Sequence, residues 1–104
     1  MSNYKLLYIT CGSKNEAVNL GKLIVKNKLA ACTNIFSNIN SIFNWNNKVS
    51  QSKETILVGK TQKKNITKII KFIESRHSYD CPCILFFYIE KGNKKFLSWI
   101  RKNS

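Results

Sequence analysis

The sequence predicts an α+β domain built on an antiparallel sheet. Strand and helix patterns follow one another in the order β-α-β-β-α-β, and a further helical pattern closes the chain. Two long extended stretches meet at an Asn-Asn pair, which is typical of a hairpin. The 104 residues, 43% of them hydrophobic, suffice for one core, and no linker or repeat divides them. We therefore expect residues 1–104 to form a single ferredoxin-like domain with both sheet-packing helices on one face.

The chain begins with a predicted strand followed by a predicted helix. Lys5–Cys11 is apolar and rich in residues that favour strands. Ser13 and Glu16 have the spacing of a capping box, which opens a helix. The expected inner stripe of this helix consists of Ala17, Leu20, Gly21 and Ile24, with Val25 and Leu29 beside it. A glycine inside a helix costs up to about 1 kcal/mol, so we expect close helix–sheet packing at Gly21.

A long hairpin is predicted in the middle of the chain. Ala30–Ser37 is a strand pattern, and the extended stretch continues with imperfect alternation through Ile39, Phe43 and Trp45. Asn46 and Asn47 form the expected turn, because Asn tolerates positive φ. Lys48–Ser50 starts the return strand and Glu54–Lys60 continues it.

The second half of the chain is predicted to hold a helix, a strand and a terminal helix. The helix spans about Thr61 to Arg76, with the inner stripe Ile66, Ile69, Ile70 and Ile73. Ile84–Ile89 is expected to be a buried strand, with Phe86 and Tyr88 in the core, and the last helix has the stripe Phe96, Leu97 and Ile100. One sheet face remains uncovered, and an uncovered apolar face or edge favours association with other chains.

The chain is strongly basic, with 18 Lys and Arg residues against 5 Asp and Glu residues and a net charge of +13. Such a charge attracts nucleic acid, anionic lipid or acidic protein. The alternative is a solvated surface, because Lys, Asn and Ile are enriched as in AT-rich coding sequences. Only Arg76 and Arg101 supply the forked guanidinium that suits phosphate or guanine. We favour the solvated surface.

Membrane and secretion signals are missing from the sequence. No apolar run approaches the roughly 18 residues of a membrane span, and the start of the chain lacks the order of a signal peptide. Cys11 and Cys32 lie in strand patterns, where reduced cysteine acts as a small hydrophobe. We expect a cytoplasmic protein, or an organellar one if a targeting extension has been removed.

Four segments in register resemble the CutA divalent-cation tolerance family. The family patterns are L-A-A-C-x-N, S-x-Y-x-W-x-G-K-[ILV], H-P-Y-x-x-P and G-N-x-x-Y-L-x-W-[IL]. The matching segments are Leu29–Asn34, Ser41–Val49, His77–Pro82 and Gly92–Ile100. Phe43 and Asn47 stand where Tyr and Gly are usual, while Glu54 and Lys60 fall in the family's E-x-x-L-x-x-K-T strand.

The resemblance implies a ferredoxin-like homotrimer with the architecture of the PII signalling proteins. The long hairpin and C-terminal helix would reach onto neighbouring subunits. It also implies a role in tolerance of divalent metals, copper foremost, with no enzymatic reaction. We therefore expect a non-catalytic protein that binds copper or a small ligand near the subunit interface, and that needs no cofactor to fold.

His77, Cys81 and Cys83 are the candidate metal ligands. His77 is the only histidine, and imidazole suits copper and zinc. In the family this histidine is implicated in copper binding, with a second histidine before it and a first-strand cysteine; here Arg76 and Ile9 occupy those positions. Alternatively, His77 stabilises a helix C-terminus. The two thiols suit Cu(I) or zinc, or they are incidental cysteines that replace the family's usual residues.

Six further residues are candidates for a pocket or interface near the subunit boundary: Cys32, Trp45, Glu54, Lys60, Tyr79 and Trp99. A Glu and a Lys beside a cysteine suit a small polar ligand or anion. The alternative is a buried Glu54–Lys60 ion pair that fixes strand register. Trp45 and Trp99 are expected to be interface anchors.

Two other functions share this fold. The RNA-recognition motif has the same β-α-β-β-α-β order, so a nucleic-acid module is the alternative, although its glycine-aromatic signature is missing here. An acylphosphatase-type enzyme would need an arginine in the first loop. Cys11-Gly12-Ser13 has none, so this reading ranks last.

Overall fold

The computed structural model describes residues 3–104 and confirms the predicted α+β fold. Met1 and Ser2, where the sequence shows no signal-peptide pattern, lie outside the described residues. In chain order the elements are β1 (Tyr4–Cys11), α1 (Lys14–Lys26), β2 (Cys32–Trp45), β3 (Lys48–Gln62), a 3₁₀ turn (Lys63–Asn65), α2 (Ile66–Glu74), β4 (Ile84–Tyr88) and α3 (Lys94–Lys102).

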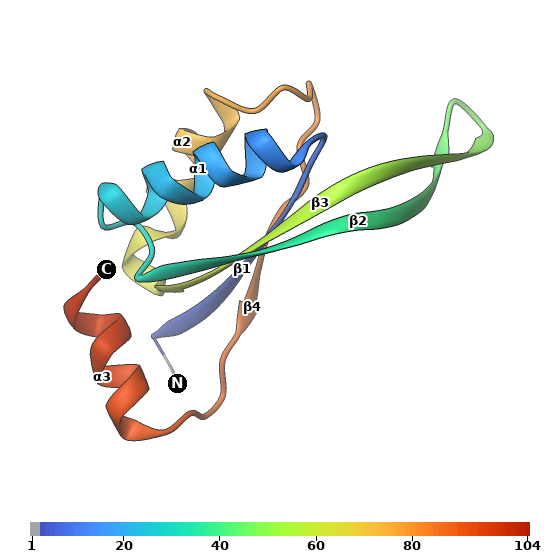
Figure 1. The fold of residues 1–104 in the computed structure, drawn as a ribbon. Coiled ribbons are helices and arrows are strands. Elements are labelled where there is room, and N and C mark those ends of the chain that lie inside the picture. Colours follow the sequence, from blue (N-terminus) through green and yellow to red (C-terminus); the bar gives the residue numbers. More distant parts are fainter. Residues whose placement is uncertain (1–2) are drawn as a thin grey trace.

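The four strands form one antiparallel sheet in the order β2-β3-β1-β4. Helices α1 and α2 lie together on one face, and the β2–β3 hairpin projects far beyond the rest of the molecule (Figure 1). This projection makes the molecule elongated, with extents of 44 × 25 × 23 Å. The arrangement is the predicted ferredoxin-like one, because the two central strands β1 and β3 are separated in sequence by α1 and the whole of β2.

The core lies between the sheet and the two helices. Leu7 and Ile9 of β1 and Leu57 of β3 are fully buried, with Ile9 and Leu57 directly paired across the strands. Residues opposite one another in adjacent strands share a face, so this pairing defines the inner side of the sheet. From the helices, the core receives Ala17, Leu20 and Ile24 of α1 and Ile69 and Ile73 of α2.

Gly21 lets α1 approach the sheet closely. A Cβ atom at this position would lie 2.9 Å from Thr33 Oγ1 and 3.3 Å from Leu57 Cδ1. The first distance is shorter than Cβ contacts allow, so an alanine here would force Thr33 or the helix to shift. This observation confirms the close helix–sheet packing that the sequence predicts at Gly21.

The other face of the sheet carries several apolar side chains, and neither α1 nor α2 covers it (Figure 1). Tyr8 pairs with Leu85 on one side and Val58 on the other, and Leu6 pairs with Phe87. The rings of Tyr8 and Phe87 meet edge to face at 6.1 Å. The prediction that β4 is buried is wrong for the single chain, because Leu85, Phe87 and Tyr88 are about half exposed while Phe86 packs on the core. Strand β4 lies at the sheet edge, and one of its faces is uncovered.

The hairpin is longer and more regular than its sequence pattern suggests. Strand β2 runs unbroken to Trp45, with an irregularity between Phe36 and Ile39 where Asn38 has a φ of 58°. A bulge of this kind reverses the alternation, which explains the imperfect sequence pattern. Asn46 and Asn47 both have positive φ, 52° and 62°, as predicted for the turn.

The prediction that the second helix starts at Thr61 is wrong. Strand β3 continues to Gln62, and α2 begins at Ile66. Thr61 is fully buried opposite Lys5, and its hydroxyl donates to the Leu29 carbonyl at 2.5 Å. Burial and pairing across the sheet therefore keep these residues in the strand.

Helix α3 packs against the end of β3. The side-chain amide of Gln62 donates to the carbonyl oxygens of Arg101, at 3.2 Å, and Ser104, at 3.0 Å. Of the predicted inner stripe, Ile100 is buried, Leu97 is half-buried and Phe96 is exposed. Within residues 3–104, no helix combines the length and the apolar character needed to cross a bilayer.

Candidate functional site

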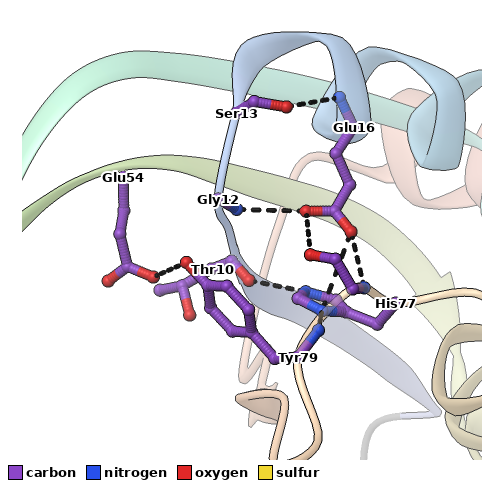
Figure 2. Close-up of polar contacts among 8 residues, drawn as sticks. Thr10, Gly12, Ser13, Glu16, Glu54, His77 and Tyr79 are labelled. Atoms are coloured by element: carbon purple, nitrogen blue, oxygen red, sulfur yellow. Dashed lines mark hydrogen bonds and ion pairs between the residues drawn. The ribbon is translucent and has the colours of Figure 1, made fainter.

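The polar centre of the molecule lies where three segments meet: the end of β1, the start of α1 and the loop after α2. Glu16 connects them through its carboxylate (Figure 2). The Gly12 N–H donates to Glu16 Oε1 at 3.1 Å, and Ser78 donates from its hydroxyl to Oε1 at 3.0 Å and from its N–H to Oε2 at 2.8 Å. One carboxylate thus fixes the loop that carries His77 and Tyr79 against the first helical turn.

The local sequence at the start of α1 explains the position of Glu16. The Ser13 hydroxyl accepts the Glu16 N–H at 3.1 Å, as expected for a helix cap. The reciprocal half of the predicted capping box is absent, because the Glu16 side chain accepts from Gly12 and Ser78 instead. Burial raises the pKa of Glu16, but the hydrogen bonds from Ser78 and Gly12 outweigh it and the pKa is lowered overall.

His77 is held through both ring nitrogens. Its imidazole is fully buried, with Nε2 2.8 Å from the Thr10 carbonyl oxygen and Nδ1 3.0 Å from the Tyr79 N–H. A carbonyl only accepts and an N–H only donates, so these partners assign the proton to Nε2 and a lone pair to Nδ1. The alternative, that His77 stabilises a helix C-terminus, holds for its backbone, because the His77 N–H donates to the Ile73 carbonyl at 2.8 Å at the end of α2. The ring instead connects the loop to β1.

Cys11 and Glu16 bring two further ligand types to His77. One ligand atom from each of Cys11, Glu16 and His77 lies within 4.8 Å of the other two. Glu16 Oε2 is 3.8 Å from His77 Nδ1. Burial, followed by the charges of Glu16 and Glu54, raises the pKa of the Cys11 thiol to about 12. The cluster therefore combines imidazole, carboxylate and a buried protonated thiol, a donor set that suits zinc or copper.

Tyr79 links this cluster to strand β3. Its hydroxyl donates to Glu54 Oε2 at 2.9 Å, and its ring lies 4.8 Å from the His77 ring. Burial, with the hydrogen bond to Glu54 next, raises the pKa of Tyr79 to about 12. The phenol therefore stays protonated and serves as a hydrogen-bond donor.

A hollow of about 720 Å³ lies on the outer side of Tyr79. Its lining brings together five of the residues that the sequence singles out, namely Trp45, Glu54, Tyr79, Cys81 and Cys83. Trp45 is on the projecting hairpin, whereas the cysteines lie on the irregular segment before β4. Among the described residues, His77, Cys81 and Cys83 do not come together as one set of ligands.

The remaining candidates lie elsewhere. Cys32 pairs with Lys60 across β2 and β3, and Lys60 Nζ donates to the Asn34 side-chain oxygen. The alternative of a Glu54–Lys60 ion pair is wrong, because six residues along one strand separate the two by about 20 Å. Trp99 stacks on Phe96 of α3 at 5.4 Å and lines a separate lysine-rich hollow.

Sequence reasoning missed Cys11 and Glu16 as possible ligands. The sequence pattern places Glu16 in a helix cap and Cys11 in the core, and each residue does occupy that place. The available signal was their position, since the end of β1 and the first turn of α1 are joined by only Gly12 and Ser13. His77 comes from 61 residues later in the chain, so only the fold shows the cluster.

Known proteins match nearly the whole length of this chain. Residues 5–103 match the family of the CutA1 divalent ion tolerance protein. A divalent-cation tolerance protein CutA of Archaeoglobus fulgidus is 38% identical over 97 residues, which cover 93% of this chain and 94% of that protein. The Thermus thermophilus divalent cation tolerance protein has a solved structure with a TM-score of 0.95 and 32% identity, covering 97% of this chain and 98% of that one.

Other relatives are longer. The chain spans 53% of the human protein CutA, to which it is 30% identical over 95 residues. Neither the family match nor these relatives support the nucleic-acid alternative. Because the match covers nearly the whole chain and the fold agrees throughout, the protein belongs to the CutA divalent-cation tolerance family.

Proposed function

We propose that this protein serves divalent-metal tolerance by binding a divalent cation, copper foremost, without catalysing a reaction. The observation that carries the proposal is the meeting of Cys11, Glu16 and His77 ligand atoms within 4.8 Å. The Nε2–H of His77 is directed at the Thr10 carbonyl, an arrangement that commonly orients metal-binding histidines. Nδ1 then offers its lone pair on the side of Glu16.

Copper is the preferred ion on chemical grounds. Among divalent first-row ions, Cu²⁺ binds nitrogen, oxygen and sulfur donors most tightly. An ion at this site would replace the Tyr79 N–H as the partner of Nδ1 and displace the proton of the Cys11 thiol. Binding would therefore weaken as the pH falls.

The proposal includes a homotrimer. The uncovered sheet face, the hairpin and α3 all expose large apolar side chains, with Phe87 48% exposed, Trp45 60% and Trp99 41%. Large exposed apolar side chains of this kind favour protein–protein contact. A trimer would have a mass of three times the 12.0 kDa of the chain. A monomer in light scattering at micromolar concentration would contradict this part of the proposal.

We further place the protein in the cytoplasm. All four cysteines are free, as a reducing compartment maintains them. A solved structure from Archaeoglobus fulgidus is named a periplasmic divalent cation tolerance protein, and the rice and Arabidopsis relatives are named chloroplastic. Fractionation of the native host with an antibody to this chain tests the location directly, and recovery in an extracytoplasmic fraction would contradict it.

Calorimetric titration of the reduced, metal-free protein with Cu²⁺ tests the metal site. We expect His77→Gln to lower the affinity at least tenfold, because loss even of groups that only orient a ligand costs about 10–100-fold. The matched control is Arg76→Gln, an exposed neighbour whose guanidinium lies over the Phe72 ring. Equal affinities for the two variants would contradict the proposed site.

A further inference from the structure

The hollow beside Tyr79 differs in charge from the rest of the molecule. Its lining holds two of the five acidic residues, Glu54 and Asp80, and none of the 18 Lys and Arg residues. Three other hollows within residues 3–104 are each lined by at least one basic residue. On a chain with a net charge of +13, this hollow is therefore a local environment that favours a cation.

Two of the four cysteines line the same hollow. Cys81 is exposed and Cys83 half-buried, and only Pro82 separates them. Both thiols are free, and neither makes a hydrogen bond or ion pair within the part of the chain that the structure describes. An ion that binds the two thiols would therefore not have to break a hydrogen bond or an ion pair.

The number of ligand groups near the two thiols indicates which thiolate-binding ion the hollow suits. Thiolates suit Cu⁺ and Zn²⁺, but protein zinc sites use three or four protein ligands. Within residues 3–104, Cys11, Glu16 and His77 form the one group in which three such ligand atoms gather within 4.8 Å. No third His, Cys, Asp or Glu joins Cys81 and Cys83 in this way, and a monovalent d¹⁰ copper ion is satisfied by two thiolates.

We propose that Cys81 and Cys83 bind one Cu⁺ as a bis-thiolate site, separate from the cluster at His77. Two S–H bonds break, two S–Cu bonds form, and both protons leave to solvent while copper keeps its oxidation state. Glu54 and Asp80 attract the incoming cation, and Trp45 on the hairpin forms an apolar wall of the hollow. This site does not depend on the proposed divalent site, so either proposal can fail alone.

Competition for Cu⁺ against bicinchoninate, under anaerobic conditions with excess reductant, tests the site. We expect one tightly bound Cu⁺ per chain. The double variant Cys81→Ser/Cys83→Ser should lose at least about 100-fold in affinity, whereas Cys32→Ser, the matched thiol control on β2, should bind as the native chain does. An unchanged affinity in the double variant, or an equal loss in His77→Gln, would overturn the proposal.

Alkylation of the native chain gives a second readout that needs no variant. One equivalent of Cu⁺ should protect Cys81 and Cys83 from iodoacetamide, measured by peptide mass spectrometry, with Cys32 labelled as before. The same experiment with one equivalent of Zn²⁺ should leave both residues labelled. Protection by Zn²⁺ but not by Cu⁺, or protection of Cys32 in place of the pair, would contradict a two-thiolate copper site.

Discussion

Removal of the Glu16 carboxylate should loosen the loop that carries His77 and Tyr79. The carboxylate accepts three hydrogen bonds, from Gly12 N, Ser78 N and Ser78 Oγ. Each contributes about 1 kcal/mol net at a partly solvated position, so Glu16→Ala should lower the free energy of unfolding by about 2–3 kcal/mol. Glu16→Gln keeps one acceptor oxygen but turns its NH₂ toward a donor, so we expect a smaller loss of about 1–2 kcal/mol.

The effect of Glu16 should also depend on pH in a defined direction. Its pKa is lowered in the folded protein from the ordinary value of 4.5, so folding favours the ionised form. The stabilisation is complete above pH 4.5 and is lost as the pH falls through the lowered pKa. The difference in stability between the native chain and Glu16→Gln should therefore shrink on acidification below pH 4.5.

Urea unfolding of metal-free protein at equal chain concentration measures both effects. Glu74→Ala is the control, since Glu74 is an exposed carboxylate at the end of α2 and should change stability by less than about 0.5 kcal/mol. A loss below 0.5 kcal/mol for Glu16→Ala, equal to that of the control, would refute the role given to the Glu16 carboxylate. A difference in stability between the native chain and Glu16→Gln that grows on acidification would also refute this role.

Three further predictions concern packing, the phenol and association. Gly21→Ala should destabilise by about 1 kcal/mol in urea unfolding, because the clash with Thr33 exceeds the gain in helix propensity; a stabilised variant would contradict the close approach. In an absorbance titration, the phenol that ionises with a pKa of about 12 should be missing from Tyr79→Phe. Because the pKa of Tyr79 is raised by folding, the stabilisation from its protonated hydroxyl should be lost as the pH rises from the ordinary value of 10.0 through about 12. Phe87→Lys should shift the light-scattering mass from three chains toward 12.0 kDa, and an unchanged mass would remove the uncovered face from the interface.

The sequence predicts the elements that depend on local pattern. The inner stripe of α1 and the Asn46–Asn47 turn follow from periodicity and from positive φ, both of which are local properties. The start of α2 is missed because Thr61 and Gln62 are held in β3 by burial and by partners far along the chain. The bulge near Asn38 interrupts the alternation of side chains, so the sequence pattern does not show that β2 is continuous.

The site was less predictable than the fold. The family resemblance identifies His77, but its partners follow from tertiary structure, in which β1 and the loop after α2 become neighbours. Cys81 and Cys83 stand out in the sequence as a C-x-C pair, yet their separation from His77 appears only when the chain is folded. Composition alone also conceals the lysine-free hollow on a chain of net charge +13.

A cobalt titration tests the divalent site most directly, because Co²⁺ bound to a thiolate gives a near-ultraviolet charge-transfer band. We predict one such band per chain that survives in Cys81→Ser/Cys83→Ser and disappears in both Cys11→Ser and His77→Gln. A band that persists without Cys11 and His77, or that depends on Cys81 and Cys83 instead, would contradict the assignment of the divalent ion to Cys11, Glu16 and His77.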